Sequence, residues 1–421
     1  LETVLAHTYG IIVFQEQVDQ LLQIFCDYSS GEAEDIRDKI HKRRREDYGQ
    51  LIKDEVLGRI RGRGYSEKVA QQVFEMIAGF KGYGFAQGHA LAFAEISIRS
   101  IWCQQNHPAA YFASLLDAQP AGYYGPCTLA NEARARGVAM LPPDVNASTL
   151  KFEVVDVQSD QDPKLVFPGG GIRVSLAQIG SISKGVRERI VESRHNLGAF
   201  GSLYDFCVRV QPARDELEQL ILCGACDGLH SNRRAMLWAV NEVISAAEGQ
   251  ARAGGLELSM EPPRLPNVPD FSLAEKAVHE RSVLGMDVLR HLMAFERERI
   301  LAKGGITSSQ AKTLKDGDLA IVVGNPIRLR FPPTPSGKRV VFFDLEDECG
   351  LLNVTCFDAT YRRDGHAIVC SPYVTLIGRA QDRDGHTAFL AHRVHPYRPS
   401  LAGEVQAAQA IPIRAADFLV G

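Results

Sequence analysis

Long apolar runs are absent from this 421-residue sequence, and no stretch reaches the roughly 18 residues that a membrane-spanning helix needs. The N-terminus also lacks the basic, apolar, small-residue leader of a secreted protein. We therefore expect a cytoplasmic protein with no membrane partner. The first residue is Leu rather than Met, so we also expect a processed piece or a part of something longer.

Cysteine is too scarce for a disulfide framework. The nine cysteines are spread irregularly along the chain, which predicts reduced thiols. Cys223 and Cys226 have C-x-x-C spacing, but a zinc site needs a second pair of cysteines or histidines at matching spacing. His230 alone does not complete such a set of ligands. The sequence predicts no metal site in this chain.

An excess of positive charge is also lacking, because the formal net charge is -4. This value argues against a uniformly basic nucleic-acid binder. The charge is nevertheless uneven, since lysine and arginine outnumber acids in "RDKIHKRRREDYGQLIKDEVLGRIRGR", between Arg37 and Arg63. This segment is either a solvated helix face or a phosphate-binding face, where cations neutralise a polyanion and release its counterions.

What is present is an ordinary globular composition, 45% hydrophobic and 23% charged, over a length that suits two to four domains. Apolar residues at three- and four-residue steps predict helices over the first 150 residues. We expect Ser30 and Ser66 as N-caps, a long helix beginning near Gln87, and Pro108 as the first residue of the next helix. From about Val154 two short strands precede further helices, and the last of these is the amphipathic "SLAEKAVHERSVLGMDVLRHLMAFERER".

Two segments predict helix-hairpin-helix units in tandem, "LAQIGSISKGVRERIVESR" and, further along, "ELEQLILCGACDGL". In such a unit the amides of a tight hairpin and of the next helix N-terminus receive a DNA phosphate without reading bases. The candidate DNA contacts are Ser181 and Ser183 in the first hairpin, with Lys184 and Arg187 on the adjoining turn. The alternative is an ordinary helical hairpin that packs on the C-terminal barrel.

The last hundred residues are rich in Val, Ile, Phe and Thr and predict β-strands, including "AIVCSPYVTLIGRAQDRDGHTAFLAHRV". Five short strands at this spacing suit a small barrel of the OB type. Such barrels bind single strands by stacking bases on aromatic rings and following phosphates with cations, and the alternative is a barrel used only for docking. The candidate contacts around "RLRFPPTPSGKR" are Arg328, Arg330, Phe331, Lys338 and Arg339.

These motifs, in this order, resemble the C-terminal portion of the bacterial C-family DNA polymerases, the DNA polymerase III alpha-subunit family. "TYGIIVFQEQV", "YSSGEAEDIRDKIHK" and "GYGFAQGHALAFAEISIRSIWCQQNHPAAYFASLL" are similar to its fingers region. "GAFGSLYDFCVRV" with "LCGACDGL" is similar to its tandem hairpin domain, and "VVFFDLEDECGLLNVTCFD" to its OB barrel. The passage "AQPAGYYGPCTLANEARARGVAMLPPDVNAS" resembles the error-prone paralogue more than the replicative one.

The resemblance implies an α+β multidomain fold of five parts. They are a helical fingers region at 1–153, a strand pair plus tandem helix-hairpin-helix DNA-binding domain at 154–245, a linker and helical connector at 246–310, an OB-fold barrel at 311–398, and a C-terminal tail at 399–421.

In the fingers, the resemblance implies that Arg37 and Lys42 face the incoming triphosphate and that His89 occupies the position of a family histidine in a Ser-His pair. Arg43 and Arg99 are further candidate phosphate contacts. His89 lies near the start of a predicted helix, and a helix N-terminus favours negative charge, which suits a phosphate contact. The alternative is that His89 is a helix cap or a packed side chain.

The sequence departs from the family at four of these positions. Asp38 stands where the family usually has an arginine, and Gly88 replaces the serine before the histidine, which predicts weaker triphosphate binding. Ser181 and Ser183 replace the glycines of the first hairpin, so DNA contact there is less favoured.

The resemblance implies that catalysis needs residues from outside this chain. The family holds its two metal ions on an Asp-x-Asp motif of a palm domain upstream of the fingers. Asp382 and Asp384 have that spacing but lie between two predicted strands and predict a hairpin turn. We therefore expect a C-terminal fragment of an error-prone, translesion or repair DNA polymerase, with no catalytic residue or cofactor of its own and with Mg²⁺ required by the complete enzyme.

The expected partners are primer-template duplex, single-stranded template and a deoxynucleoside triphosphate, with a sliding clamp or translesion accessory proteins as further candidates. "QLLQIF", from Gln20 to Phe25, loosely suits a clamp peptide, but its apolar side should be core. The alternative function is a non-catalytic DNA-binding scaffold that recruits a repair or replication assembly.

Overall fold

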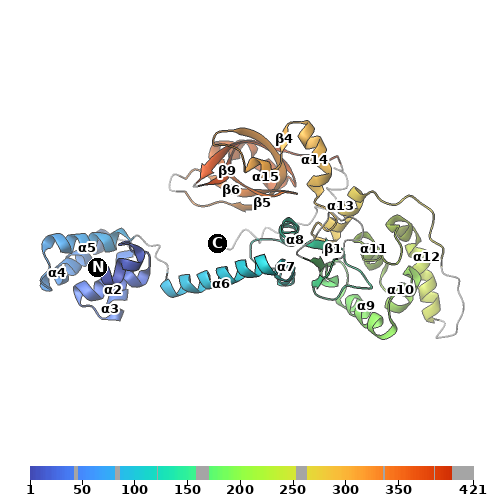
Figure 1. Cartoon of the computed structure of the whole chain (residues 1–421), viewed down its shortest axis with the longest axis horizontal. Helices are drawn as coiled ribbons and strands as arrows, with labels where there is room; N and C mark the ends of the chain where they lie inside the picture. Colours follow the sequence, from blue (N-terminus) through green and yellow to red (C-terminus); the bar gives the residue numbers. More distant parts are fainter. Residues whose placement is uncertain are drawn as a thin grey trace. The chain divides into compact units, whose positions relative to one another are not determined.

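The computed structural model describes residues 1–41, 46–80, 86–120, 122–157, 170–252, 263–334, 337–383 and 385–400. The chain forms two compact units, Leu1–Cys103 (unit 1) and Gln104–Gly421 (unit 2), and the boundary lies within helix α6 (Gln87–Asn106) (Figure 1). Each unit has buried hydrophobic clusters of its own. No helix of the described ranges is long and apolar enough to cross a bilayer.

Unit 1 is helical, as its apolar periodicity predicts. Val18, Leu21, Val56, Ile60 and Ile77 have no more than 1% of their surface exposed and form the centre of its core. Its elements before α6 are α1 (Glu2–Leu5), η1 (Ala6–Thr8), α2 (Gln15–Cys26), α3 (Ser30–His41), α4 (Glu46–Gly62) and α5 (Glu67–Gly79).

The helix starts in unit 1 follow capping chemistry. Ser66 accepts a hydrogen bond from the Val69 amide and caps α5, as predicted. The cap of α3 is Ser29 rather than the predicted Ser30, because Ser29 Oγ accepts from the Glu32 amide while the Glu32 carboxylate accepts from the Ser29 amide at 2.8 Å. This reciprocal capping box satisfies two amides and places the helix start one residue earlier.

Unit 2 begins with α7 (Pro108–Asp117) and α8 (Pro126–Ala135), which lead into a three-stranded sheet. Pro108 is the first residue of α7, as predicted. The predicted strand pair is present as β2 (Glu153–Val155) and β3 (Gly171–Arg173), which are antiparallel. β1 (Ala139–Leu141) pairs with β3 in parallel and was not predicted, since three residues are too few to show a strand period.

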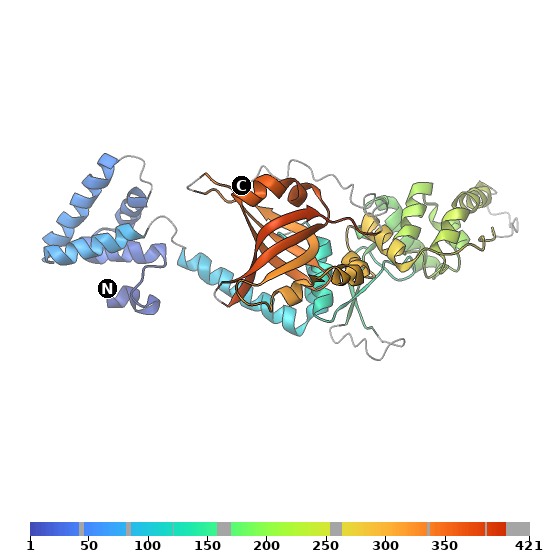
Figure 2. The same ribbon diagram turned by 90° about the horizontal axis from the view of Figure 1, so that it is seen from above.

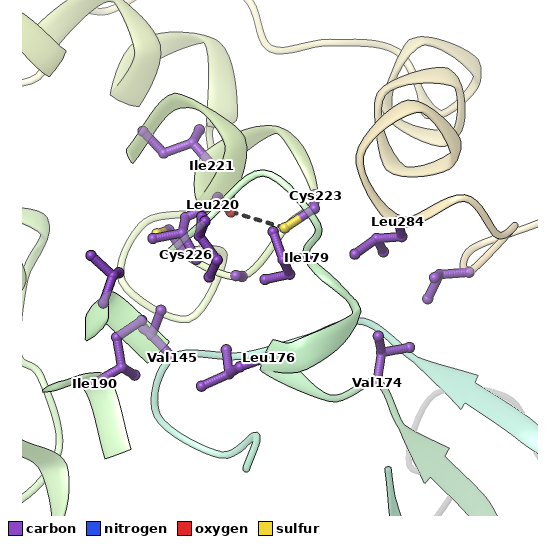
Figure 3. Packing of buried hydrophobic residues seen from close by; sticks show 14 of the residues in the cluster. Val145, Val174, Leu176, Ile179, Ile190, Leu220, Ile221, Cys223, Cys226 and Leu284 are labelled. Carbon is purple, nitrogen blue, oxygen red and sulfur yellow. Dashed lines mark hydrogen bonds between the residues drawn. The ribbon is translucent and has the colours of Figure 1, made fainter. Parts of the chain in front are cut away.

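The helix-hairpin-helix region packs around a core drawn in Figure 3. Ile179, Ile190, Leu220 and Cys226 are all fully buried there. Its elements are η2 (Leu176–Gln178), α9 (Lys184–Leu197), α10 (Leu203–Val210), α11 (Arg214–Leu222) and α12 (Arg233–Arg252).

The amphipathic segment after this region is two helices rather than one. α13 (Leu273–Leu284) ends at Gly285, whose φ of 65° is the left-handed conformation of a helix C-cap. The chain then turns before α14 (Leu292–Ala302). The correction has a local cause, because glycine reaches this conformation without a steric penalty.

The last part of unit 2 is a closed barrel of five strands, extended by the short strand β4 (Gly305–Ile306) (Figures 1 and 2). β7 and β9 are parallel, and β8 pairs back with β5 to close the barrel, which agrees with the predicted OB fold. The remaining elements are α15 (Ser308–Ala311), β5 (Leu319–Arg330), β6 (Val340–Asp347), β7 (Gly350–Phe357), α16 (Asp358–Cys370), β8 (Val374–Arg383) and β9 (His386–Pro396).

Two features of the barrel differ from a simple run of strands. "AIVC", which was predicted as part of a strand, is the end of α16, and its Ala367 and Ile368 lie in the barrel core. Gly324 marks the point where β5 exchanges its partner β8 for β6. A Cβ on Gly324 would lie 2.5 Å from the Glu346 carbonyl oxygen, so only glycine permits this close crossing.

Candidate nucleic-acid interface

The outward residues of β6 and β7 form one face of the barrel, which we call the outer face. Along β6, Val341, Phe343 and Leu345 point into the core. Alternation therefore places Phe342 and Asp344 on the outer face. Phe342 is paired with Thr355 of β7, and Asp344 with Asn353. OB barrels bind oligonucleotides on this face and on the loops between strands one and two and strands four and five.

Four of the five predicted barrel contacts lie exposed at the edge of this face. Arg330 ends β5 opposite Phe342, and Phe331, Lys338 and Arg339 lie in the loop that leads to β6. Phe331 is 44% exposed, and its ring meets the Tyr361 ring edge to face, with centroids 5.8 Å apart. The barrel topology thus brings cations and an aromatic ring together beside the outer face.

Arg328, the fifth predicted contact, is engaged by the protein itself. It lies at an irregularity of the β5–β6 pairing with a φ of 55°. Its Nη1 donates to Asp344 Oδ2 at 2.8 Å and to Tyr124 Oη at 2.5 Å, and its guanidinium lies 4.2 Å from the centre of the Tyr124 ring. A bulge can re-aim a side chain in this way, so Arg328 connects β6 to the loop before α8.

The first hairpin begins α9 as predicted, but one of its amides is already bound. Ser183 caps α9 by accepting from the Val186 amide. The Ser183 amide itself donates to Glu216 Oε1 at 2.8 Å. Partial burial acts to raise the pKa of Glu216, yet the amide bonds from Ser183 and Ala213 hold that pKa below its usual value. A carboxylate of the chain therefore occupies part of the place expected for a DNA phosphate.

The two basic residues of the first hairpin differ in their surroundings. Arg187 Nη2 donates to the carbonyls of Ile179 and Ile182 at 2.9 and 2.8 Å, so this side chain shapes the hairpin. The Lys184 side chain is 86% exposed, with its Nζ 3.6 Å from the carboxylate of Glu188. Ser181 is also exposed. Lys184 and Ser181 are thus better placed than Arg187 to meet a phosphate.

The second hairpin is stabilised by buried side-chain contacts that the sequence alone did not predict. Cys223 and Cys226 are fully buried in the core, and burial raises the pKa of the Cys223 thiol to about 12. Arg233 is 2% exposed and donates to Asp227 at 2.7 Å and to Glu280 at 2.9 Å. The C-x-x-C pair is part of the core here, and a buried arginine at the start of a helix has no periodic signal.

The predicted phosphate contacts of unit 1 that the structure describes do not form one cluster of unpaired cations. The Arg37 side chain is 12% exposed and pairs with Asp19. His89 is exposed near the start of α6, with its ring centre 4.5 Å from that of Phe93. Arg99 is exposed and pairs with Glu95 one turn away. Lys42 and Arg43 lie outside the described residues.

The N-terminus of α6 also holds a carboxylate. The Gln87 amide donates to both carboxylate oxygens of Glu16, each at 2.9 Å. Glu16 belongs to α2, so the anion that the helix N-terminus favours comes from within unit 1.

Two further sequence expectations concern motifs outside these sites. Leu21, Leu22 and Phe25 of "QLLQIF" are buried on α2, as predicted. Asp382 lies at the end of β8, beside the predicted hairpin turn, and Asp384 lies outside the described residues. No group of three or more His, Cys, Asp or Glu side chains in the described ranges could hold a metal ion.

Two family models match parts of the chain. Residues 1–61 match the bacterial DNA polymerase III alpha subunit finger domain, and residues 137–236 match the helix-hairpin-helix motif. The error-prone DNA polymerase of Symbiobacterium thermophilum is 35% identical to this chain, over 94% of this chain and 39% of the relative. That of Mycobacterium tuberculosis strain H37Rv is 30% identical, over 93% of this chain and 34% of the relative.

The chain therefore spans about two fifths or less of the length of these relatives. Among solved structures, the hypothetical protein ygiW from E. coli matches 22% of the chain with 15% identity and a TM-score of 0.18, which is too weak to bear on function.

Proposed function

Because this chain belongs to the bacterial DNA polymerase III alpha-subunit family and has error-prone DNA polymerases as relatives, we propose that it is the DNA-holding part of such a polymerase. The observation that carries the proposal is the outer face of the barrel with its exposed rim of Arg330, Phe331, Lys338 and Arg339. Cations at this rim follow the phosphates of a single-stranded template, and the aromatic rings stack on its bases.

The helix-hairpin-helix region binds the duplex through its backbone. Ser181 and Lys184 are exposed at the first hairpin and support this role, since a phosphate needs an accessible donor or cation. Such contacts position the protein without reading sequence, as a polymerase requires on any template.

The complete polymerase adds deoxynucleotides to a primer during translesion or repair synthesis in the bacterial cytoplasm. The phosphates of the incoming nucleotide are assigned to Arg37, Lys42, Arg43, His89 and Arg99, and a sliding clamp or accessory proteins recruit the enzyme. We assign Mg²⁺ to the Asp-x-Asp carboxylates that the family holds upstream of the fingers, in the complete enzyme. Mg²⁺ there would activate the primer hydroxyl and stabilise the leaving pyrophosphate.

Binding of a fluorescent single-stranded oligonucleotide at several salt concentrations tests the role of the barrel. The Lys338→Ala/Arg339→Ala variant should bind more weakly and should lower the slope of log affinity against log salt by about 1.4, because each lost contact to a single strand removes about 0.7. Lys303→Ala/Lys312→Ala is the matched control, since it removes two exposed cations from outside the β5–β6 loop. An equal affinity and slope in the loop variant and the wild type would contradict the proposal.

A further inference from the structure

Two tyrosines stand in a loop whose role the proposed function does not explain. Tyr123 and Tyr124 lie between α7 and α8, flanked by Gly122 and Gly125. Tyr123 is 85% exposed, and Gly122 has a φ of 67°, which lets the chain turn sharply just before it. An aromatic ring presented to this degree contributes almost nothing to the core.

The loop is fastened to the barrel through its second tyrosine. Tyr124 receives both a hydrogen bond and a cation–π contact from Arg328. Arg328 is in turn held by Asp344, which is 2% exposed. Tyr124 of the loop, Arg328 of β5 and Asp344 of β6 thus contact one another in sequence. These contacts hold the loop that contains Tyr123 against the barrel.

The point of attachment borders the open part of the outer face. α8 covers one end of that face, since Asn131 Nδ2 donates to Glu346 Oε1 at 3.1 Å. Asp344 lies two residues from Glu346 along β6 and accepts a hydrogen bond from Arg328, which also contacts Tyr124. Phe342, two residues further, is half-buried and lies opposite the exposed Arg330. The loop that carries Tyr123 is therefore attached to the barrel through Tyr124, at Arg328 and Asp344, which lie two residues from Arg330 and Phe342.

We propose that Tyr123 is a stacking platform for an unpaired base of a single-stranded nucleic acid, with Tyr124 and Arg328 as its positioning residues. The inference rests on the proposed function and extends the barrel site to a loop outside the barrel. A single strand suits this place because the ring offers a flat apolar surface while Arg330, Lys338 and Arg339 supply charge for the phosphates. In a duplex the base faces are covered by their neighbours and cannot stack on a side chain.

The test compares a single-stranded oligonucleotide with an abasic strand of equal length, which keeps the phosphates and lacks the bases. Tyr123→Ala should lower affinity for the intact strand about 5- to 150-fold, the range expected for the loss of one base–aromatic stack. Its salt dependence should stay that of the wild type, because no cation is removed. On the abasic strand the two proteins should bind equally.

Two further variants separate stacking from folding. Tyr123→Phe keeps the ring and should bind the intact strand as the wild type does. Tyr9→Ala removes a ring that is 96% exposed in unit 1 and should not change binding.

The outcomes distinguish a failure of the stacking platform from a failure of the proposed function. If the wild type binds neither strand, the proposed function fails. If the wild type binds the intact strand and Tyr123→Ala binds it equally well, the platform is wrong while the function stands. An equal loss on the intact and abasic strands would also overturn the platform, because the base would then have no part in the effect.

Discussion

Glu16 and Glu216 show how single residues can occupy sites that suit a phosphate. Each places a carboxylate on a backbone amide at or beside a helix start, Glu16 on the Gln87 amide of α6 and Glu216 on the Ser183 amide before α9. The physical attraction is the same in both cases, since these amides lack a helical partner and carry partial positive charge. A DNA or triphosphate group that approaches either place must compete with a carboxylate of the chain.

The first prediction concerns this competition at the first hairpin. Glu216→Gln should raise affinity for duplex DNA by about 2- to 5-fold, because removing a helix-terminal charge interaction is worth about 0.3–1 kcal/mol. Fluorescence anisotropy with a labelled duplex measures the change. Glu218→Gln is the control, because it removes the same charge from the same helix without touching Ser183. An equal gain from both variants would show a general charge effect instead.

A second prediction follows from the lowered pKa of Glu216. The stability that its ionised form adds is fully present above the usual pKa of 4.5 and is lost as the pH falls through the lower pKa of the folded state. Urea unfolding at pH 7 and at pH 3 should therefore show a smaller loss of unfolding free energy for Glu216→Gln than for the wild type. Equal losses would mean that the carboxylate is not bound to these amides.

Helices α12 and α13 are joined by the buried arginine of the second hairpin. Arg233 donates to Glu280 on α13, to Asp227 in the hairpin and to the Leu222 carbonyl at the end of α11. Gly224 makes room for this side chain, since a Cβ there would lie 2.3 Å from Arg233 Nη2. The hairpin and the helices α11, α12 and α13 thus meet at one guanidinium.

The third prediction tests this junction. Arg233→Met should lower the unfolding free energy of unit 2 by about 3–5 kcal/mol, because it leaves the Glu280 carboxylate buried without its partner. Arg214→Met breaks an exposed pair with Glu218 and should cost about 0–1 kcal/mol. Denaturant unfolding followed by circular dichroism measures both. A similar cost for the two variants would show that the buried pair does not hold the helices.

The two compact units have separate cores, so the intact chain should unfold in two steps. Leu22 is fully buried in the core of unit 1 and Phe206 in a core of unit 2. Scanning calorimetry should show two transitions, the smaller one from the shorter unit 1, because the unfolding enthalpy grows with the number of residues.

The fourth prediction assigns these transitions. Leu22→Ala should lower the midpoint of the smaller transition alone, and Phe206→Ala that of the larger one alone, each by the loss of about 2–5 kcal/mol of packing. A single transition, or a shift of both by either variant, would mean that the units unfold together.

Much of the fold could be predicted because its signals are local. Apolar spacing indicates the helices of unit 1, Ser66 and Pro108 indicate helix starts, and β-branched runs indicate the barrel strands. The errors are also local in origin. β1 is too short to show a period, the apolar end of α16 is ambiguous between helix and strand, and Gly285 interrupts an amphipathic segment whose pattern continues through it.

The sequence by itself determined most of the element types, the family resemblance and the candidate cations, because these depend on spacing and residue type along the chain. Only the tertiary structure decided which of those cations remain exposed. Arg37 and Arg187 are engaged by partners within the fold, whereas Lys184, Arg330, Lys338 and Arg339 face solvent. The juxtaposition of Tyr124 with Arg328, 204 positions apart, likewise had no sequence signal, because a contact between distant residues is set by how the loop and the barrel pack.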